Sequence, residues 1–188
     1  MEAIAVLMAA IKEKYRTFAI HIIDHCFEQI LRGIEENDFK DAQRRVSMMK
    51  FLGSCYNYKV LHTDTLFTLL YKLINLEVDG SVDTRLSELD KPNDCFRVNL
   101  VCTLLESLGR NLFTKHKRRL LMDRFLIFFQ RYVFMKNYLL MEVEFQLLDT
   151  LENIRPKHAP KLRNLKSSQE ACARIIEAER NRGSITVQ

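Results

Sequence analysis

His21 and His25 are the residues whose type and spacing come nearest to a metal site. They are four residues apart, with Asp24 and Cys26 beside them. Two histidines at that spacing share one face of a helix and can supply two zinc ligands. No third ligand set follows at metal-binding spacing, so these side chains are better explained as histidines on a helix surface. We therefore expect no bound metal.

The cysteines are a second candidate for chemistry. They are odd in number, no two have the spacing C-x-x-C, and all five lie in apolar stretches: Cys26, Cys55, Cys95, Cys102 and Cys172. Apolar surroundings raise the pKa of a thiol and make it a poor nucleophile. We therefore expect reduced, buried thiols, as in a protein of the cytosol or nucleus.

Motifs of the common enzyme classes do not occur in this sequence. It contains no GxSxG, Walker-type loop, GxGxxG or HExxH, each of which places catalytic or phosphate-binding groups at a fixed spacing. The carboxylates of Glu142 and Glu144 are two residues apart, so on a helix they point to different sides. A cysteine and a histidine could still meet in space. We predict a protein that is not an enzyme and needs no cofactor.

Charge is divided along the chain more sharply than the net value of +5 suggests. Residues 77–94 hold six acids against two bases, and residues 110–136 hold eight bases against one acid. A second basic stretch, "RPKHAPKLRNLK", covers 155–166. Such segregation predicts an acidic surface and a basic one, able to hold two different partners. Ordinary solvated surfaces would have the same composition, so both interpretations stay open.

The elements that position these charges are helices. The chain has 5 glycines and 3 prolines in 188 residues, which leaves few positions that break a helix. Ser167 and Glu170 have capping-box spacing, and Pro92 suits a first helical turn. Apolar periodicity predicts eight helices, at about 2–34, 38–56, 62–77, 92–112, 117–137, 142–154, 157–164 and 168–182.

Antiparallel helices with short connections predict an all-α fold of stacked helical hairpins, with a closed bundle as the alternative. We expect a single domain over residues 1–188. Residues 78–91 form the longest stretch without periodicity, and long connections in compact helical domains are often binding loops. No apolar run reaches the roughly 18 residues of a membrane span, so no membrane partner is predicted.

Several separated stretches resemble one known family. "KFLGSCYNY" (50–58) is similar to a stretch that opens a helical hairpin in the middle domain of translation initiation factor four-G, the MIF4G family. The segments 79–109, 117–136 and 148–157 resemble the third such domain of the up-frameshift-two family, the adaptors of nonsense-mediated mRNA decay. The resemblance covers roughly residues 15–180.

The sequence departs from this family in three places. Asn93 stands where an acid is expected, although Asp94 follows it, and the connection around Tyr138–Glu144 is shorter. The first helical hairpin of the family domain is missing. We therefore expect either a fragment or a divergent member of the family.

The resemblance implies a HEAT-like α-solenoid and a non-enzymatic scaffold in nonsense-mediated decay, located in the cytoplasm and its perinuclear part. It also implies docking of the RNA-recognition-motif domain of the up-frameshift-three protein, with other decay and translation-termination factors as further partners. In this family, acids meet basic residues on the sheet of that domain. The corresponding set here is Asp79, Asp83, Glu88, Asp90, Asp94, Arg97 and Glu106, with Arg97 interpreted as an internal brace for nearby acids.

The alternative function is an RNA-binding or translation-factor-binding MIF4G module that uses the basic helices. Its candidate residues are Lys115, Lys117, Arg118, Arg119, Lys157, Lys161 and Arg163. Lysine and arginine neutralise phosphates with salt-dependent affinity. Few aromatic residues are interleaved with them, which argues against stacking on single-stranded bases. Charge reversal at Asp90 and Asp94 is expected to separate the two functions.

Overall fold

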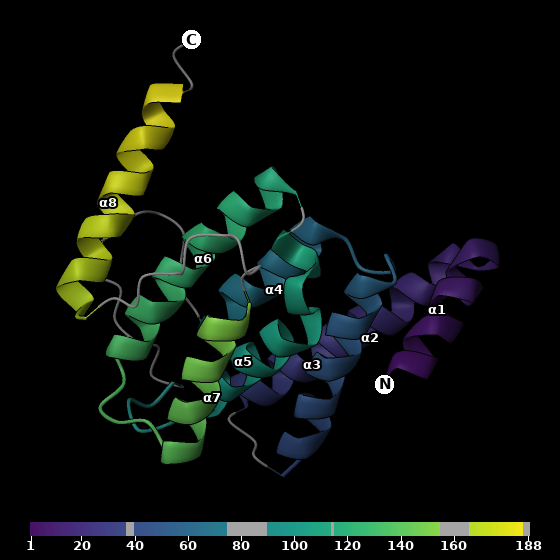
Figure 1. Cartoon of the computed structure of the whole chain (residues 1–188). Coiled ribbons are helices and arrows are strands. Elements are labelled where there is room, and N and C mark those ends of the chain that lie inside the picture. Colours follow the sequence, from purple (N-terminus) through teal and green to yellow (C-terminus); the bar gives the residue numbers. More distant parts are fainter. Residues whose placement is uncertain (37–39, 75–89, 114, 155–165, 186–188) are drawn as a thin grey trace.

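The computed structural model describes residues 1–36, 40–74, 90–113, 115–154 and 166–185 (Figure 1). Within these ranges the chain is helical and has no strand, which confirms the predicted all-α class. The elements are α1 (Glu2–Lys14), α2 (Arg16–Glu35), α3 (Ala42–Asn57), α4 (Thr63–Ile74), α5 (Phe96–Leu108), the 3-10 helix η1 (Gly109–Phe113), α6 (His116–Phe134), α7 (Met141–Asn153) and α8 (Ser168–Ile185).

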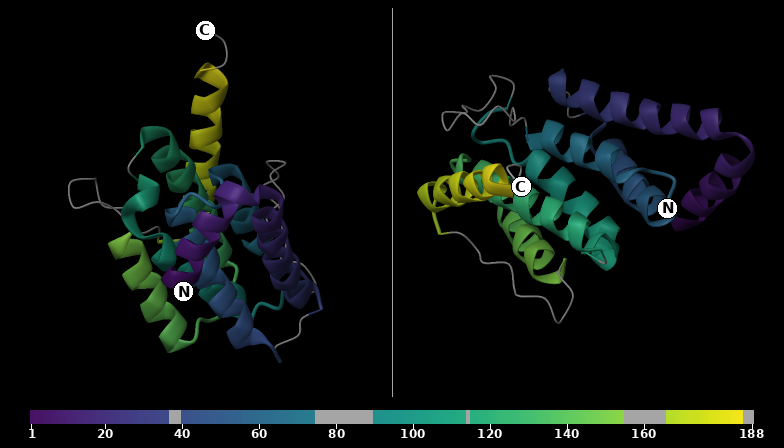
Figure 2. Two further views of the ribbon diagram at one scale, coloured as in Figure 1. Left: turned by 90° about the vertical axis from the view of Figure 1, so that its right-hand side faces the viewer. Right: turned by 90° about the horizontal axis from the view of Figure 1, so that it is seen from above.

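Alternate helices stack on one another in two layers. In one layer α3 contacts α1 and α5, and α5 contacts α7; in the other, α6 contacts α4 and α8. Figures 1 and 2 show α1 and α8 at opposite ends of this stack. Such one-way stacking is the geometry of HEAT-like helical hairpins rather than of a closed bundle. The solenoid prediction is therefore confirmed.

The closest packing in the stack lies between α3 and α5. A Cβ added at Gly53 would clash with the Cβ of Ser107 and lie 3.2 Å from the backbone carbonyl carbon of Ser107. The Asn57 amide donates a hydrogen bond of 2.9 Å to the Ser107 carbonyl and accepts one of 3.0 Å from Asn111. "KFLGSCYNY" thus supplies both the small residue that lets the two helices approach and the amide that joins their ends.

Tyr56 fixes the corner between α3 and α4. Its side chain is buried, and its hydroxyl accepts a hydrogen bond of 3.0 Å from Arg118 and lies 3.4 Å from the Thr63 hydroxyl. Tyr58, two residues further on, is 43% exposed. Of the two tyrosines, Tyr56 therefore stabilises this corner.

Several helix boundaries differ from the prediction. The helix expected over residues 2–34 is broken at Tyr15, whose backbone is not helical (φ −129°, ψ 65°). The break lets α1 fold back against α2 and α3 and bury Ala5 and Met8. The helix expected from residue 92 begins at Phe96, so Pro92 lies before the helix and not in its first turn.

The predicted cap of α8 is present in a modified form. The Ser167 hydroxyl accepts a hydrogen bond of 3.2 Å from the Glu170 amide, as a capping box requires. The Glu170 carboxylate accepts instead from the Lys166 amide, at 2.9 Å. The helix predicted at 157–164 lies outside the described residues.

Candidate functional site

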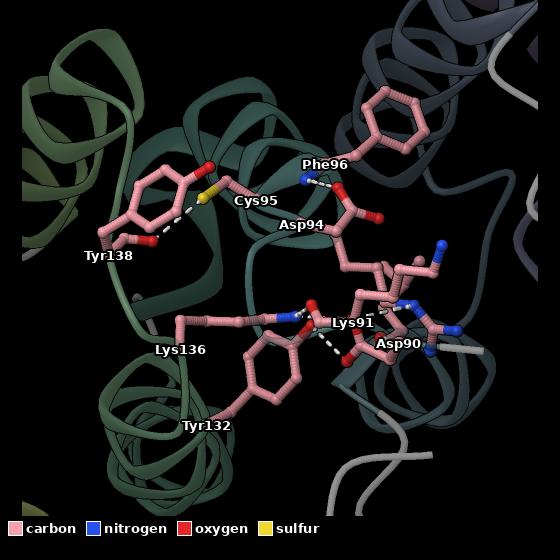
Figure 3. A network of polar contacts seen from close by, with 10 residues as sticks. Asp90, Lys91, Asp94, Cys95, Phe96, Tyr132, Lys136 and Tyr138 are labelled. Carbon is pink, nitrogen blue, oxygen red and sulfur yellow. Dashed lines mark hydrogen bonds and ion pairs between the residues drawn. The ribbon is translucent and has the colours of Figure 1, made fainter. Parts of the chain in front are cut away.

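Asp90, the last acid of the loop predicted over residues 78–91, is fully buried. The Tyr132 hydroxyl donates a hydrogen bond of 2.7 Å to one of its carboxylate oxygens, and the Lys136 ammonium lies 2.5 Å from the other. Figure 3 shows these two side chains reaching toward Asp90, Tyr132 from the end of α6 and Lys136 from the turn that follows it. The Arg97 Nε, from α5, lies 3.7 Å from the same carboxylate. One acid thus ties together two helices and the chain that precedes them.

This burial corrects the assignment of Asp90 to an exposed docking surface. Its carboxylate is held by three groups of the same chain and does not face solvent. Lys136 is also buried: it donates to the Lys91 carbonyl at 3.2 Å and lies 4.9 Å from the centre of the Tyr132 ring. Burial and the charge of Asp90 raise the pKa of Tyr132, so this phenol stays protonated and remains a donor.

Arg97 is a further member of this interior network. It is 6% exposed, and one of its guanidinium nitrogens donates to the Leu73 carbonyl at 3.4 Å. The interpretation of Arg97 as an internal brace is confirmed by its ion pair with Asp90. Its place in the set of partner-binding residues is wrong, because little of the side chain reaches the surface.

Asp94 is half-buried and stands just before α5. One of its carboxylate oxygens accepts a hydrogen bond of 2.8 Å from the Phe96 amide. This bond from an aspartate to the amide two residues on satisfies a free N–H at the start of the helix. Asp94 therefore stabilises the start of α5 and remains partly accessible to a partner.

The segment around Asp94 is fixed to the connection between α6 and α7. The Asn137 amide donates to the Pro92 carbonyl at 3.0 Å, and its side chain donates to the Asn93 side chain at 2.9 Å. The Cys95 thiol contacts the Tyr138 carbonyl at 3.3 Å (Figure 3). The chain that follows the acidic loop is therefore held in one position against α6 and α7.

Glu106 is exposed near the end of α5, where its carboxylate accepts a hydrogen bond of 3.1 Å from the Thr150 hydroxyl of α7. Asp94 and Glu106 are twelve residues apart, which corresponds to about 18 Å along a helix. The structure therefore does not gather them into one cluster. Asp79, Asp83 and Glu88 lie outside the described residues.

Basic residues gather at the start of α6. Lys115 and Lys117 are exposed, whereas Arg118 and Arg119 are half-buried. Arg118 donates to the Tyr56 hydroxyl, and Arg119 lies 3.1 Å from the His116 Nδ1. The two lysines are thus the more available members of this set. Lys157, Lys161 and Arg163 lie outside the described residues.

The remaining reactive groups are poorly placed for catalysis. Burial raises the pKa of the Cys55 and Cys102 thiols to about 12, so both are protonated at neutral pH and are weak nucleophiles. His21 and His25 are exposed on α2. In the part of the chain that the structure describes, no three His, Cys, Asp or Glu side chains come together as metal ligands, and no helix there is long and apolar enough to cross a membrane.

Sequence analysis missed Tyr132 and Lys136 as partners of Asp90. They are four residues apart, Tyr132 in the last turn of α6 and Lys136 just after it, and they meet an acid more than forty positions away. The available signal was the lysine at the end of the apolar run "FLIFFQRYVFMK", since a charge in such a run requires a buried partner. The identity of that partner depends on the tertiary fold.

The layered fold and the α3–α5 junction define a MIF4G-type helical domain. The sequence matches the MIF4G domain over residues 1–157, and the chain therefore belongs to this family. It is 34% identical over 191 residues to "Regulator of nonsense transcripts 2" of Homo sapiens and 35% identical over 153 residues to "Regulator of nonsense transcripts UPF2" of Arabidopsis thaliana. These alignments cover 96% and 81% of this chain, but 14% and 13% of the relatives. "Nonsense-mediated mRNA decay protein 2" of Saccharomyces cerevisiae is 32% identical over 145 residues, 73% of this chain and 13% of the relative.

Proposed function

We propose that this domain is a non-enzymatic adaptor of nonsense-mediated mRNA decay in the cytoplasm. Its acidic surface binds the RNA-recognition-motif domain of the up-frameshift-three protein. The observation that carries the proposal is the alignment with regulators of nonsense transcripts over 96% of the chain, a span that includes the acidic segment. Other decay and termination factors are further candidate partners.

Electrostatics supports a basic partner. Residues 77–94 hold six acids against two bases, and acids so close together repel one another. The buried pair of Asp90 with Lys136 neutralises one of them inside the fold. Asp94 remains partly accessible, and complementary charge across such an interface sets the association rate and the specificity.

Charge reversal tests the acidic surface, with the up-frameshift-three domain as the titrant. One variant carries Asp79→Lys, Asp83→Lys and Glu88→Lys, and a second carries Asp94→Lys and Glu106→Lys. Glu13→Lys, at an exposed position on α1, is the matched control. We expect the triple variant to weaken the calorimetric Kd by at least about tenfold and the control to leave it unchanged. Circular dichroism checks that each variant is folded.

Asp90 is left unchanged in this experiment, because reversing a buried charge would unfold the protein and abolish binding for that reason alone. The proposal is wrong if both reversals leave Kd within about twofold of the parent chain. If affinity is lost in the double variant alone, the binding site lies on the surface near α5 and not on the acidic loop.

A second function, RNA binding, is favoured by the bases at the start of α6. Lys115, Lys117 and their arginine neighbours stand at a helix N-terminus, and the first turn of α6 contains no acid. The helix dipole disfavours positive charge at that end. A bound phosphate would offset this cost.

Binding of a single-stranded RNA oligonucleotide at several salt concentrations tests this second function. Each lysine that contacts a phosphate contributes about one unit to the slope of log K against log salt. Lys115→Glu with Lys117→Glu should therefore flatten the slope, and Lys72→Glu, exposed on α4, should not. An unchanged slope in the double variant would exclude α6 as the RNA site.

A further inference from the structure

The outer face of α7 carries an apolar stripe that no described element covers. Met141, Phe145 and Leu148 are 71%, 61% and 42% exposed. Their spacing of i, i+4 and i+7 puts them on one face of the helix. The opposite face packs against α5 and buries four side chains: Val143, Leu147, Thr150 and Leu151. α7 thus has two apolar faces: one packs against α5, and the other is exposed on the outer side of the helix.

Acidic residues flank this stripe. α7 contains four acids and no base: Glu142, Glu144, Asp149 and Glu152. All four are exposed. Among the ion pairs between described residues, none includes these carboxylates. A helix with charge −4 therefore lies on the surface of a chain whose net charge is +5.

The described part of the fold accounts for only part of this charge. Glu142 and Glu144 lie in the first turn, where the helix dipole favours an acid. Asp149 and Glu152 lie near the other end, where the dipole favours a base, and the last turn contains none. Asp149 also lines the same small hollow between α5 and α7 as Glu106. Asp149 and Glu152 therefore destabilise α7 unless a positive charge lies close to them.

We propose that the outer face of α7 is a docking site for a basic amphipathic helix of a partner protein. Apolar side chains of that helix would pack on Met141, Phe145 and Leu148, while flanking lysines or arginines would meet the acids. This is the common mode in which a helix anchors itself on a surface through residues at i, i+3, i+4 and i+7. The exposed stripe supplies the apolar contact, and the acids favour a partner with positive charge.

Charge argues against the other occupants. RNA would bring phosphates against four carboxylates. A second copy docked through the same face would bring four acids against four acids, which costs free energy through like-charge repulsion. The proposal is independent of binding through the acidic loop, because none of the α7 acids belongs to the set assigned to the up-frameshift-three domain.

The test uses the complete 188-residue chain and a fluorescent synthetic peptide of about five helical turns, with leucines at i, i+3, i+4 and i+7 and lysines beside them. A second peptide carries glutamates in place of the lysines. Phe145→Ser and the pair Glu142→Lys with Asp149→Lys change the face. Phe18→Ser, on α2 and 53% exposed, is the matched control.

We expect the basic peptide to bind and the acidic peptide not to bind. Phe145→Ser and the charge pair should each weaken binding by at least about tenfold, while Phe18→Ser leaves it unchanged. Binding of the up-frameshift-three domain should persist in Phe145→Ser, which separates this site from the acidic loop. Equal binding of the basic peptide to Phe145→Ser and the parent chain would overturn the proposal. So would peptide competition with the up-frameshift-three domain, or self-association of the chain that Phe145→Ser abolishes.

Discussion

Replacement of Asp90 by alanine is the perturbation with the largest expected effect on this domain. It removes the carboxylate that pairs with Lys136 and Arg97 and that accepts the Tyr132 hydroxyl bond. The Lys136 side chain is fully buried, and among the described residues it would keep only the Lys91 carbonyl as a hydrogen-bond acceptor. Removing one partner of a buried pair costs about 3–5 kcal/mol, because the other charge stays in the core without compensation.

The magnitude is large relative to the whole fold. A domain of this kind has a free energy of unfolding of about 5–15 kcal/mol, so Asp90→Ala should remove a third of it or more. Asp94→Ala is the matched comparison, since it deletes a single hydrogen bond to the Phe96 amide. Loss of such a bond at a helix start costs about 1 kcal/mol. Urea unfolding followed by circular dichroism measures both values.

A double variant separates pairing from packing. Asp90→Leu with Lys136→Met removes the Asp90–Lys136 pair, keeps apolar volume and leaves Arg97 as the one charge of the network, so it should be more stable than Asp90→Leu alone. Two results would refute the argument: a cost below about 1 kcal/mol for Asp90→Ala, or a double variant whose loss equals the sum of the single losses.

Two further predictions concern the core. Gly53→Ala should lower the free energy of unfolding by about 1–3 kcal/mol through overpacking against Ser107. The control, Lys50→Ala at an exposed position on the same helix, should change it little. Equal urea midpoints for the two variants would contradict the close approach of α3 and α5. In the thiol test, Cys55 and Cys102 should resist Ellman's reagent at pH 8 until urea is added. Burial raises the pKa of both from about 9 to about 12, so the unfolded state releases these protons first. Stability should therefore fall as the pH rises from about 9 to about 12, and Cys55→Ala with Cys102→Ala should flatten that fall.

The class of the fold was predictable from local signals in the sequence. Apolar periodicity identified α4 and α6 to within a few residues, because their buried faces repeat every three to four positions. The break at Tyr15 was not predictable in this way. No glycine or proline stands there, and the non-helical backbone is stabilised by packing of α1 on α2 and α3. Tertiary contacts decided that boundary.

The candidate site was predictable in its charge and not in its geometry. Composition identified an acidic segment but could not tell which of its acids face outward. Asp90 and Asp94 differ by four positions, yet one is fully buried and the other is partly accessible. The difference comes from Lys136 and Tyr132, whose positions beside Asp90 depend on how α6 packs.

The burial of Asp90 also changes how charge on this domain should be interpreted. Asp90 lies within the acidic segment but pairs inside the core, so it fixes the chain at that point, and Asn137 holds the residues that follow it. The Asp90–Lys136 pair therefore fixes the orientation of the chain around α5, and neither residue contacts a partner. Loss of partner binding in an Asp90 variant would report on that orientation, and only surface acids such as Asp94 and Glu106 can report on contact. Stability and affinity must be measured together on each variant, because binding to the folded state alone also raises the apparent stability.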